Sequence, residues 1–247
     1  MPDRRRIGCL LFLAVAVLAA ILGWREYQRL VRTQPELFPW TPLSLADPVG
    51  RFTAAKLIAL RDQPGQCRAL LAAAGAAHRE ARAVRPAEPA CGYDEALELG
   101  PSGQSDLRYA PAKVVTSCPV AAALLLWERD VVQPAAERLL GERVARIDHF
   151  GSYSCRRLNG RPDSAFSEHA TANAIDIAGF RTAAGRRITV IDNWQRSDVD
   201  AAFLREVRSG ACDLFATTLS PDYNAAHADH LHLDQAARGK SGWRACR

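Results

Sequence analysis

Two short stretches in which apolar and polar residues alternate constrain the fold more than any other feature of the chain. Residues 230–234 read His-Leu-His-Leu-Asp, so in a strand both histidines and the aspartate share one face while the leucines pack on the other. Residues 174–178 read Ala-Ile-Asp-Ile-Ala, which places Asp176 on the face opposite the two isoleucines. We therefore expect two half-buried strands that turn their polar side chains toward one cleft.

The polar residues of these strands are of the types that bind a metal. His169 precedes Asp176 by seven residues, on a predicted loop that enters the strand, and His232 lies on the last strand. Two imidazoles and one carboxylate leave a fourth position of zinc open for water, which is typical of catalytic zinc sites. A lone His-x-His is usually a surface or hydrogen-bonded feature, and another divalent ion has similar preferences. The joint occurrence of both patterns favours a metal site built from two of the histidines and one carboxylate of these segments.

Two residues beside His232 are candidates for the general base of such a site. His230 shares its strand face and is our first choice. Asp229, three residues before His232, is the rival, but strand alternation places it on the opposite face unless a bulge intervenes. The alternative role for His230 is to orient a metal ligand.

The N-terminus has the pattern of a membrane segment. Three arginines, residues 4–6, precede an uncharged apolar run over residues 7–24. That run is short for a spanning helix and long for the core of a signal peptide. No clear small-x-small cleavage site ends it, so we favour an uncleaved anchor over a signal. With the arginines in the cytoplasm, the rest of the chain lies in the periplasm as a single-pass protein of the inner membrane.

Cysteine usage and charge agree with export. Six cysteines follow the membrane segment, an even number that predicts disulfides in an oxidising compartment, although 15 pairings are open. They are Cys67, Cys91, Cys118, Cys155, Cys212 and Cys246. Their spacing excludes the Cys-x2-Cys pairs of structural zinc sites. The net charge is +5, of which the first 36 residues contribute +3 (six arginines against three acidic residues), so +2 remains for residues 37–247. No nucleic-acid partner is indicated.

We expect one domain after the anchor. Residues 1–24 form the anchor or signal, residues 25–45 a proline-containing linker, and residues 46–247 an α+β domain. Its first part is predicted to be mostly helical and strand signals dominate from Val144 onward. The predicted class is an antiparallel sheet that carries the metal site, with helices packed around it and an N-terminal membrane helix before it. Helices are expected near residues 53–61, 66–77, 118–132, 134–140 and 198–209, and strands at 144–149, 174–180, 187–191 and 230–234.

Several motifs resemble one bacterial family. Residues 37–247 look like the bacterial extensin-like C-terminal domain family. The motifs that carry this resemblance are Trp40-Thr-Pro-Leu, Cys91-Gly-Tyr, Cys118-Pro-Val-Ala, Gly151-Ser-Tyr-Ser-Cys-Arg, Ser167-Glu-His-Ala and the segment from Pro221 to Asp234. The family name suggests a plant wall glycoprotein, but the chain has no Ser-Pro repeats.

The site motifs also resemble a wider group of zinc peptidases, which includes D-alanyl-D-alanine carboxypeptidases and murein endopeptidases. Their Ser-x-His-x6-Asp pattern matches Ser167, His169 and Asp176, and their His-x-His element matches His230 and His232. The resemblance implies zinc bound by His169, Asp176 and His232. His227 matches an additional histidine of the endopeptidases.

The resemblance to these zinc peptidases also leads to expectations for three more residues. Arg156 follows a Tyr-Ser-Cys segment, and relatives place an arginine in a comparable context to hold a substrate carboxylate. Ser167 bonds either a ligand or the substrate backbone, or it is a turn residue. Ala172 stands where the group usually has glycine, which leaves the backbone angles of that turn in question.

These observations lead to two functional hypotheses. The first is a zinc-dependent hydrolase that cuts amide bonds in peptidoglycan peptides, of carboxypeptidase or endopeptidase type. The second is a non-catalytic protein that binds or supports the cell wall and retains the zinc site.

Overall fold

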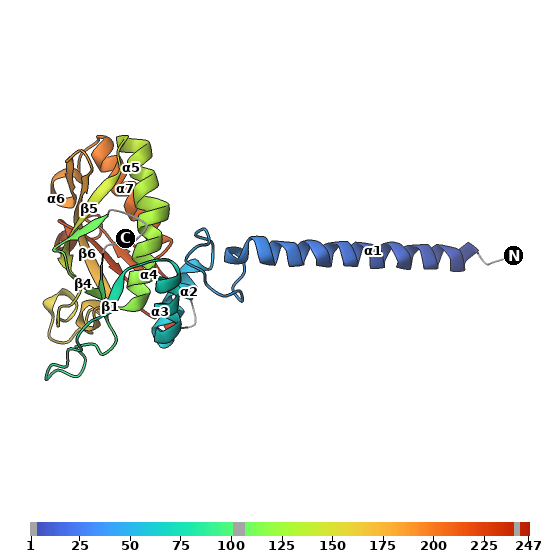
Figure 1. Ribbon diagram of the computed structural model, residues 1–247, viewed down its shortest axis with the longest axis horizontal. Helices are drawn as coiled ribbons and strands as arrows, with labels where there is room; N and C mark the ends of the chain where they lie inside the picture. The colour runs from blue at the N-terminus through green and yellow to red at the C-terminus, as the bar shows by residue number, and fades with distance from the viewer. Residues whose placement is uncertain (1–3, 101–106, 240–242) are drawn as a thin grey trace.

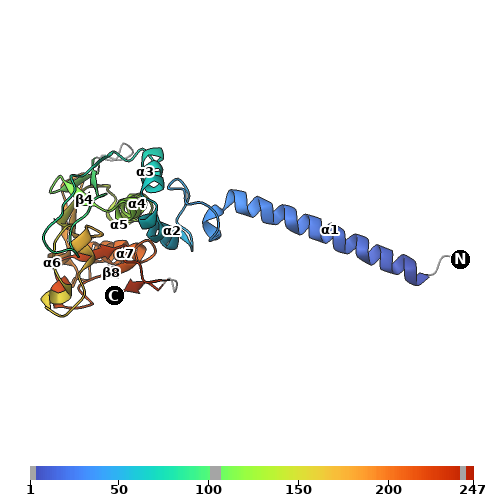
Figure 2. The same ribbon diagram turned by 90° about the horizontal axis from the view of Figure 1, so that it is seen from below.

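The computed structural model describes residues 4–100, 107–239 and 243–247. A straight helix, α1 (Arg4–Thr33), projects from a rounded α+β body that contains the rest of the chain (Figures 1 and 2). Its side chains from Ile7 onward are almost all exposed, and it is long and apolar enough to cross a membrane. The helix continues through residues 25–33, which we expected in the linker. The segment after it contains a short 3-10 turn, η1 (Pro35–Leu37).

The body is built on a seven-stranded sheet in the order β10-β8-β9-β6-β5-β3, with β7 paired to β6. Its strands are β3 (Arg108–Ala110), β5 (Val144–Gly151), β6 (Ala174–Thr182), β7 (Arg187–Thr189), β8 (Thr217–Leu219), β9 (Leu231–Asp234) and β10 (Ala245–Cys246). The central pairs β5–β6, β6–β9 and β8–β9 are antiparallel, but β3–β5 and β10–β8 are parallel. The sheet is therefore mixed, and the expectation of a purely antiparallel sheet is wrong at its two edges.

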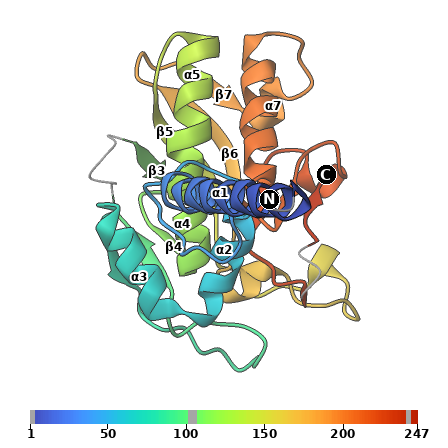
Figure 3. The same cartoon turned by 90° about the vertical axis from the view of Figure 1, so that its right-hand side faces the viewer.

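Helices cover the apolar face of this sheet. They are α4 (Cys118–Trp127), the π-helical turn η3 (Glu128–Val132), α5 (Gln133–Leu140) and α7 (Val199–Cys212). Figure 3 shows α5 and α7 side by side in front of the strands. Phe180 of β6 packs between Trp127 and Phe203, with ring centroids 5.9 and 5.1 Å away. This fully buried layer of large side chains fixes the sheet against the helices.

A smaller unit flanks the main sheet. Helices α2 (Thr53–Ala59), η2 (Leu60–Asp62) and α3 (Pro64–Ala73) pack on α4, and a three-stranded antiparallel sheet joins them. Its strands are β1 (His78–Glu80), β2 (Leu97–Leu99) and β4 (Val114–Thr116). Three disulfides, Cys67–Cys118, Cys91–Cys155 and Cys212–Cys246, resolve the pairing that the sequence left open. Cys9, in α1, is free.

Most expected elements have a counterpart, with differences at their ends. The strand expected at residues 187–191 stops at Thr189, and α6 (Val190–Asn193) follows because the Thr189 hydroxyl caps it by accepting from the Asp192 amide. The helix expected from Asp198 begins at Val199 with the Asp198 carboxylate as its cap. The last strand begins at Leu231 rather than His230.

Candidate metal centre

The two alternating strands lie next to each other and set the geometry of the site. β6 and β9 pair antiparallel, with Asp176 directly opposite His232. Ile175, Leu231 and Leu233 are fully buried on the helix-covered face, as the alternation predicted. Adjacent strands are about 5 Å apart, so side chains at paired positions on the same face come within contact distance. The polar face of this strand pair thus holds one carboxylate and one imidazole side by side.

His169 reaches the same point from a turn. It lies in η5 (Glu168–Thr171), a 3-10 helix whose cap is Ser167, with the hydroxyl 3.4 Å from the His169 amide. The turn ends at Ala172, which has a left-handed conformation with φ 54°. This is the position where glycine was expected, so alanine holds the same unusual backbone angle that a glycine adopts freely.

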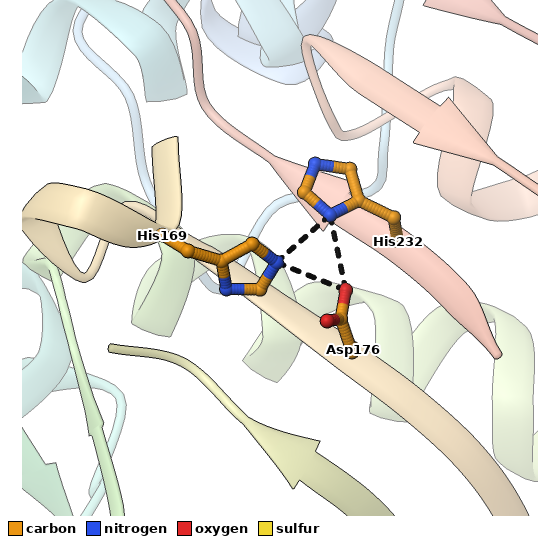
Figure 4. Close-up of side chains that lie close together, drawn as sticks. All are labelled: His169, Asp176 and His232. Atoms are coloured by element: carbon orange, nitrogen blue, oxygen red, sulfur yellow. Dashed lines mark hydrogen bonds and ion pairs between the residues drawn. The ribbon is translucent and has the colours of Figure 1, made fainter. Parts of the chain in front are cut away.

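The three predicted ligands form a compact triangle of atoms (Figure 4). Nε2 of His169, Oδ1 of Asp176 and Nδ1 of His232 lie 3.0 Å from one another along all three edges. Each residue is at least nine-tenths buried. Zinc binds such atoms at about 2.0–2.2 Å, which places neighbouring ligands of a tetrahedral ion about 3.3 Å apart. A triangle of this size and composition fits a small cation with one position left open.

The hydrogen bonds on the outer side of both imidazoles determine whether the inner nitrogens are donors or acceptors. Nδ1 of His169 lies 2.7 Å from the Ser152 carbonyl, which can only accept, so this nitrogen donates. Nε2 of His232 lies 3.1 Å from the Asp234 carboxylate and donates in the same way. In their neutral forms, both rings therefore aim a lone pair at the Asp176 carboxylate. Three acceptors this close repel one another unless a cation or a proton lies among them.

The pKa shifts of the cluster agree with the need for a cation or a proton among these three atoms. Burial would raise the pKa of Asp176, but hydrogen bonds and attraction from His169 and His232 hold it well below its usual value. Burial disfavours the charged form of His232, but hydrogen bonds to Asp176 and Asp234 outweigh it and raise the pKa to about 9. In the absence of a metal, His232 therefore carries a proton near neutral pH and balances the charge of the Asp176 carboxylate.

His230 and Asp229 lie beside the triangle as a pair. Asp229 Oδ1 is 2.7 Å from Nδ1 of His230, which directs Nε2 of that ring toward the site, 3.5 Å from Asp176 Oδ1. The His230 side chain is 10% exposed and that of Asp229 is 50% exposed. Of the two candidates for the base, His230 lies nearer to the cluster, and Asp229 orients its ring.

The other predicted site residues have different surroundings. Arg156 places Nη2 3.4 Å from Asp176 Oδ2, and half of its side chain is exposed. The Ser167 hydroxyl is engaged as the helix cap and is buried, which fits the turn alternative. His227 lies next to His230 and His232, with ring centroids 5.1 and 6.0 Å away, and burial together with the charges of these two histidines lowers its pKa to about 4.

Two supporting residues were not assigned a role from the sequence. Asp234 was placed on the correct strand face but not as the partner of His232. Ser152 orients His169 through its backbone carbonyl, and its own hydroxyl donates to the Ala174 carbonyl. A carbonyl contact leaves no trace in residue type, whereas the His-x-Asp spacing of residues 232–234 is a usable signal for a carboxylate–imidazole pair.

Comparison with known proteins identifies the family. The family described as extensin-like protein C-terminus matches residues 65–247, which is most of the chain. The chain belongs to this extensin-like family. Its metal-centre residues and all six cysteines of the disulfides fall within the matched region. No curated protein and no solved structure matches the chain.

Proposed function

We propose that this extensin-like protein is a zinc-dependent hydrolase of amide bonds in peptidoglycan peptides. The observation that carries the proposal is the convergence of two imidazole lone pairs and one carboxylate at 3.0 Å. His169, Asp176 and His232 are the proposed ligands, and Ser152 and Asp234 orient the two rings. Zinc with three protein ligands polarises a carbonyl and lowers the pKa of bound water to about 7.

The residues around the ligands have the roles that such a reaction requires. His230 donates from Nδ1 to Asp229, so Nε2 has a lone pair that accepts a proton from the attacking water and passes it to the leaving amine. Arg156 carries an exposed guanidinium beside Asp176, where it pairs with a carboxylate of the substrate. These roles need no movement of the strands, because all of these residues already lie around one point.

The cell compartment follows from two independent features. Three disulfides are stable in an oxidising compartment. Helix α1 is long and apolar enough to cross a membrane. The proposal places it in the inner membrane, with the N-terminal arginines in the cytoplasm and the domain in the periplasm. Peptidoglycan is the polymer of amide-linked peptides that a periplasmic enzyme meets there.

The direct experiment uses the full chain in detergent, with zinc content measured on the same sample. Purified muropeptides are incubated with it and the products are followed by mass spectrometry. We expect cleavage of an amide bond that is lost together with the metal in His169→Ala and in Asp176→Ala. If these variants keep stoichiometric zinc, the ligand assignment is wrong. If zinc-loaded protein binds muropeptides and cleaves none, the second hypothesis, a wall-binding protein with a retained zinc site, is correct instead.

A further inference from the structure

A cavity adjoins the metal centre on the side of His230. It has a volume of about 280 Å³ and lies against β5, β6 and β7. Ala178, two residues from Asp176 on the same strand, forms part of its wall, and Asp229 lies at its border with the metal centre. The Phe150 ring, also in the wall, packs edge-on against His230 with centroids 6.0 Å apart. The cavity is therefore a continuation of the candidate active site.

One buried atom in the cavity wall lacks a partner. His149 is 5% exposed, and its Nε2 lies 2.8 Å from the Pro111 carbonyl, to which it donates. Its other nitrogen, Nδ1, is then an acceptor, and it has no hydrogen-bond partner in the described part of the chain. This nitrogen has almost no accessible surface, so a ligand in the cavity does not contact it, and only the exposed groups of the wall are available for binding.

The charged and apolar groups of the cavity wall indicate which kind of ligand it would bind. Arg187 is exposed and makes no hydrogen bond or ion pair with any described residue. Asp229 uses one carboxylate oxygen for His230 and presents a second. Phe150 and Ile191, 61% and 59% exposed, supply apolar surface beside these charges. The exposed part of the wall thus combines a donor for a carboxylate (Arg187), an acceptor for an ammonium (Asp229) and a surface for methylene groups.

We propose that this cavity binds a substrate side chain that ends in both an ammonium and a carboxylate, as in a diamino dicarboxylic acid residue. Arg187 pairs with the carboxylate, Asp229 accepts from the ammonium, and Phe150 and Ile191 pack on the methylenes. The inference rests on the proposed peptidoglycan hydrolase and assigns the residue that it recognises next to the scissile bond. A lysine side chain lacks the carboxylate and leaves Arg187 without a partner.

Binding and cleavage are measured separately to test this. Calorimetry on the full chain in detergent, with and without zinc, compares the tripeptide L-Ala-D-Glu-meso-diaminopimelate with its L-lysine counterpart. We expect the diaminopimelate peptide to bind at least about tenfold more tightly, which is the contribution of one good ion pair. Arg187→Ala should remove this preference and Arg187→Lys should restore part of it. Arg82→Ala, an exposed arginine outside the cavity, is the matched control.

The outcomes distinguish failure of the proposed subsite from failure of the proposed hydrolase activity. Equal binding of the two peptides, no binding of either, or a preference unchanged by Arg187→Ala would overturn the subsite, even if zinc-loaded protein cleaves muropeptides. A preference that depends on Arg187, without cleavage of any muropeptide, would support the subsite and reject the hydrolase. With cleavage, the diaminopimelate preference should also appear in kcat/KM.

Discussion

At the residue scale, Asp176 holds the candidate site together. Its carboxylate is buried, and a buried charge is stable only when it is paired and hydrogen-bonded. Oδ1 contacts His169 and His232, and Oδ2 lies 3.4 Å from Arg156. A fold that needed only stability would favour an apolar side chain here, at the centre of a sheet. A bound cation, as proposed above, would give this cluster of buried polar groups a function.

The roles of His230 and Asp229 can be separated by substitution. His230→Ala should keep stoichiometric zinc and reduce kcat by about 10²–10⁴-fold, the usual contribution of a general base. Asp229→Ala should have a smaller effect, about tenfold, because it orients the ring without accepting the proton. Metal analysis and muropeptide kinetics on both variants provide the comparison. A larger loss in Asp229→Ala than in His230→Ala would identify Asp229 as the base.

Ala172 offers a test of backbone strain beside the site. Its left-handed conformation costs an alanine about 1–2 kcal/mol, which outweighs the lost methyl packing and the added freedom of the unfolded chain. Ala172→Gly should therefore leave stability unchanged or raise it by up to about 1 kcal/mol. The matched control is Ala174→Gly in β6, also fully buried but in extended backbone, which should lose about 1 kcal/mol. Urea unfolding measures both, and equal losses would contradict the strain argument.

At the scale of elements, the two site strands were predictable and their surroundings were not. Alternation over 174–178 and 230–234 identifies both strands and the face of each, because a buried face requires apolar residues at every second position. Strands β1, β2, β3, β4 and β8 have three residues each, which is too few for a periodic signal, so the residue pattern did not predict them. The parallel pairings of β3 and β10 depend on contacts distant in sequence, which residue patterns do not encode.

The same limit applies to the site. His169, Asp176 and His232 were found because their residue types and spacing are characteristic of a metal site, and the structure brings them together. The Ser152 carbonyl was not found, because any residue offers a carbonyl and only the path of the chain after β5 places this one. The register shift between Asp148 and His149 of β5, opposite Ala178, is a further tertiary feature.

The π-helical turn η3 contains a buried acid that makes stability depend on pH. Burial raises the pKa of Glu128 to about 7, although a hydrogen bond from Tyr109 acts in the opposite direction. The folded protein then keeps a proton that the unfolded chain releases near pH 4.5. The stabilisation from this group is fully present below that pH and is lost as the pH rises through 7.

Glu128→Gln should remove this dependence, because glutamine stays neutral and still accepts from Tyr109. The free energy of unfolding of the wild type should fall by up to about 3 kcal/mol more than that of Glu128→Gln between pH 4.5 and pH 8. Urea titrations of metal-free samples across this range provide the measurement. Parallel pH profiles for the two proteins would show that Glu128 does not hold a proton in the folded state.

At the scale of the whole molecule, one disulfide supports the turn that carries His169 of the candidate metal centre. Cys91–Cys155 joins two loops that both bind the His169 turn, through Gly92 to the Ala170 carbonyl at 2.8 Å and Ser154 to the His169 carbonyl at 3.0 Å. Replacing both cysteines with serine should lower stability by roughly 2–5 kcal/mol and also weaken zinc binding. The same change at Cys212–Cys246, which ties the C-terminal strand to α7, should lower stability and leave zinc affinity unchanged. Similar zinc affinities in both variants would contradict this division.

The segment between α1 and the body is attached to the body over much of its length. Nζ of Lys56 donates to the Thr41 hydroxyl at 2.8 Å, and Arg129 donates to the carbonyls of Leu45 and Asp47. Aromatic rings follow one another from the helix into this segment: Trp24 contacts Tyr27, Tyr27 contacts Phe38, and Phe38 contacts Trp40. Trp24 and Trp40 are 62% and 63% exposed. Tryptophan and tyrosine prefer the boundary between lipid and water.

If α1 spans the inner membrane as proposed, these contacts predict that the aromatic rings lie at its periplasmic surface, between lipid and water. They would then hold the body close to the lipid. In vesicles with brominated lipids, single-tryptophan variants that retain only Trp24 or only Trp40 should show strong fluorescence quenching. A variant that retains only the buried Trp127 should show none, which makes it the control. Quenching of Trp24 without Trp40 would mean that the segment moves away from the membrane, and the metal centre would then work on a longer tether. Quenching of both would show that the body is held close to the lipid surface, because the same segment is bonded to Lys56 and Arg129 of the body.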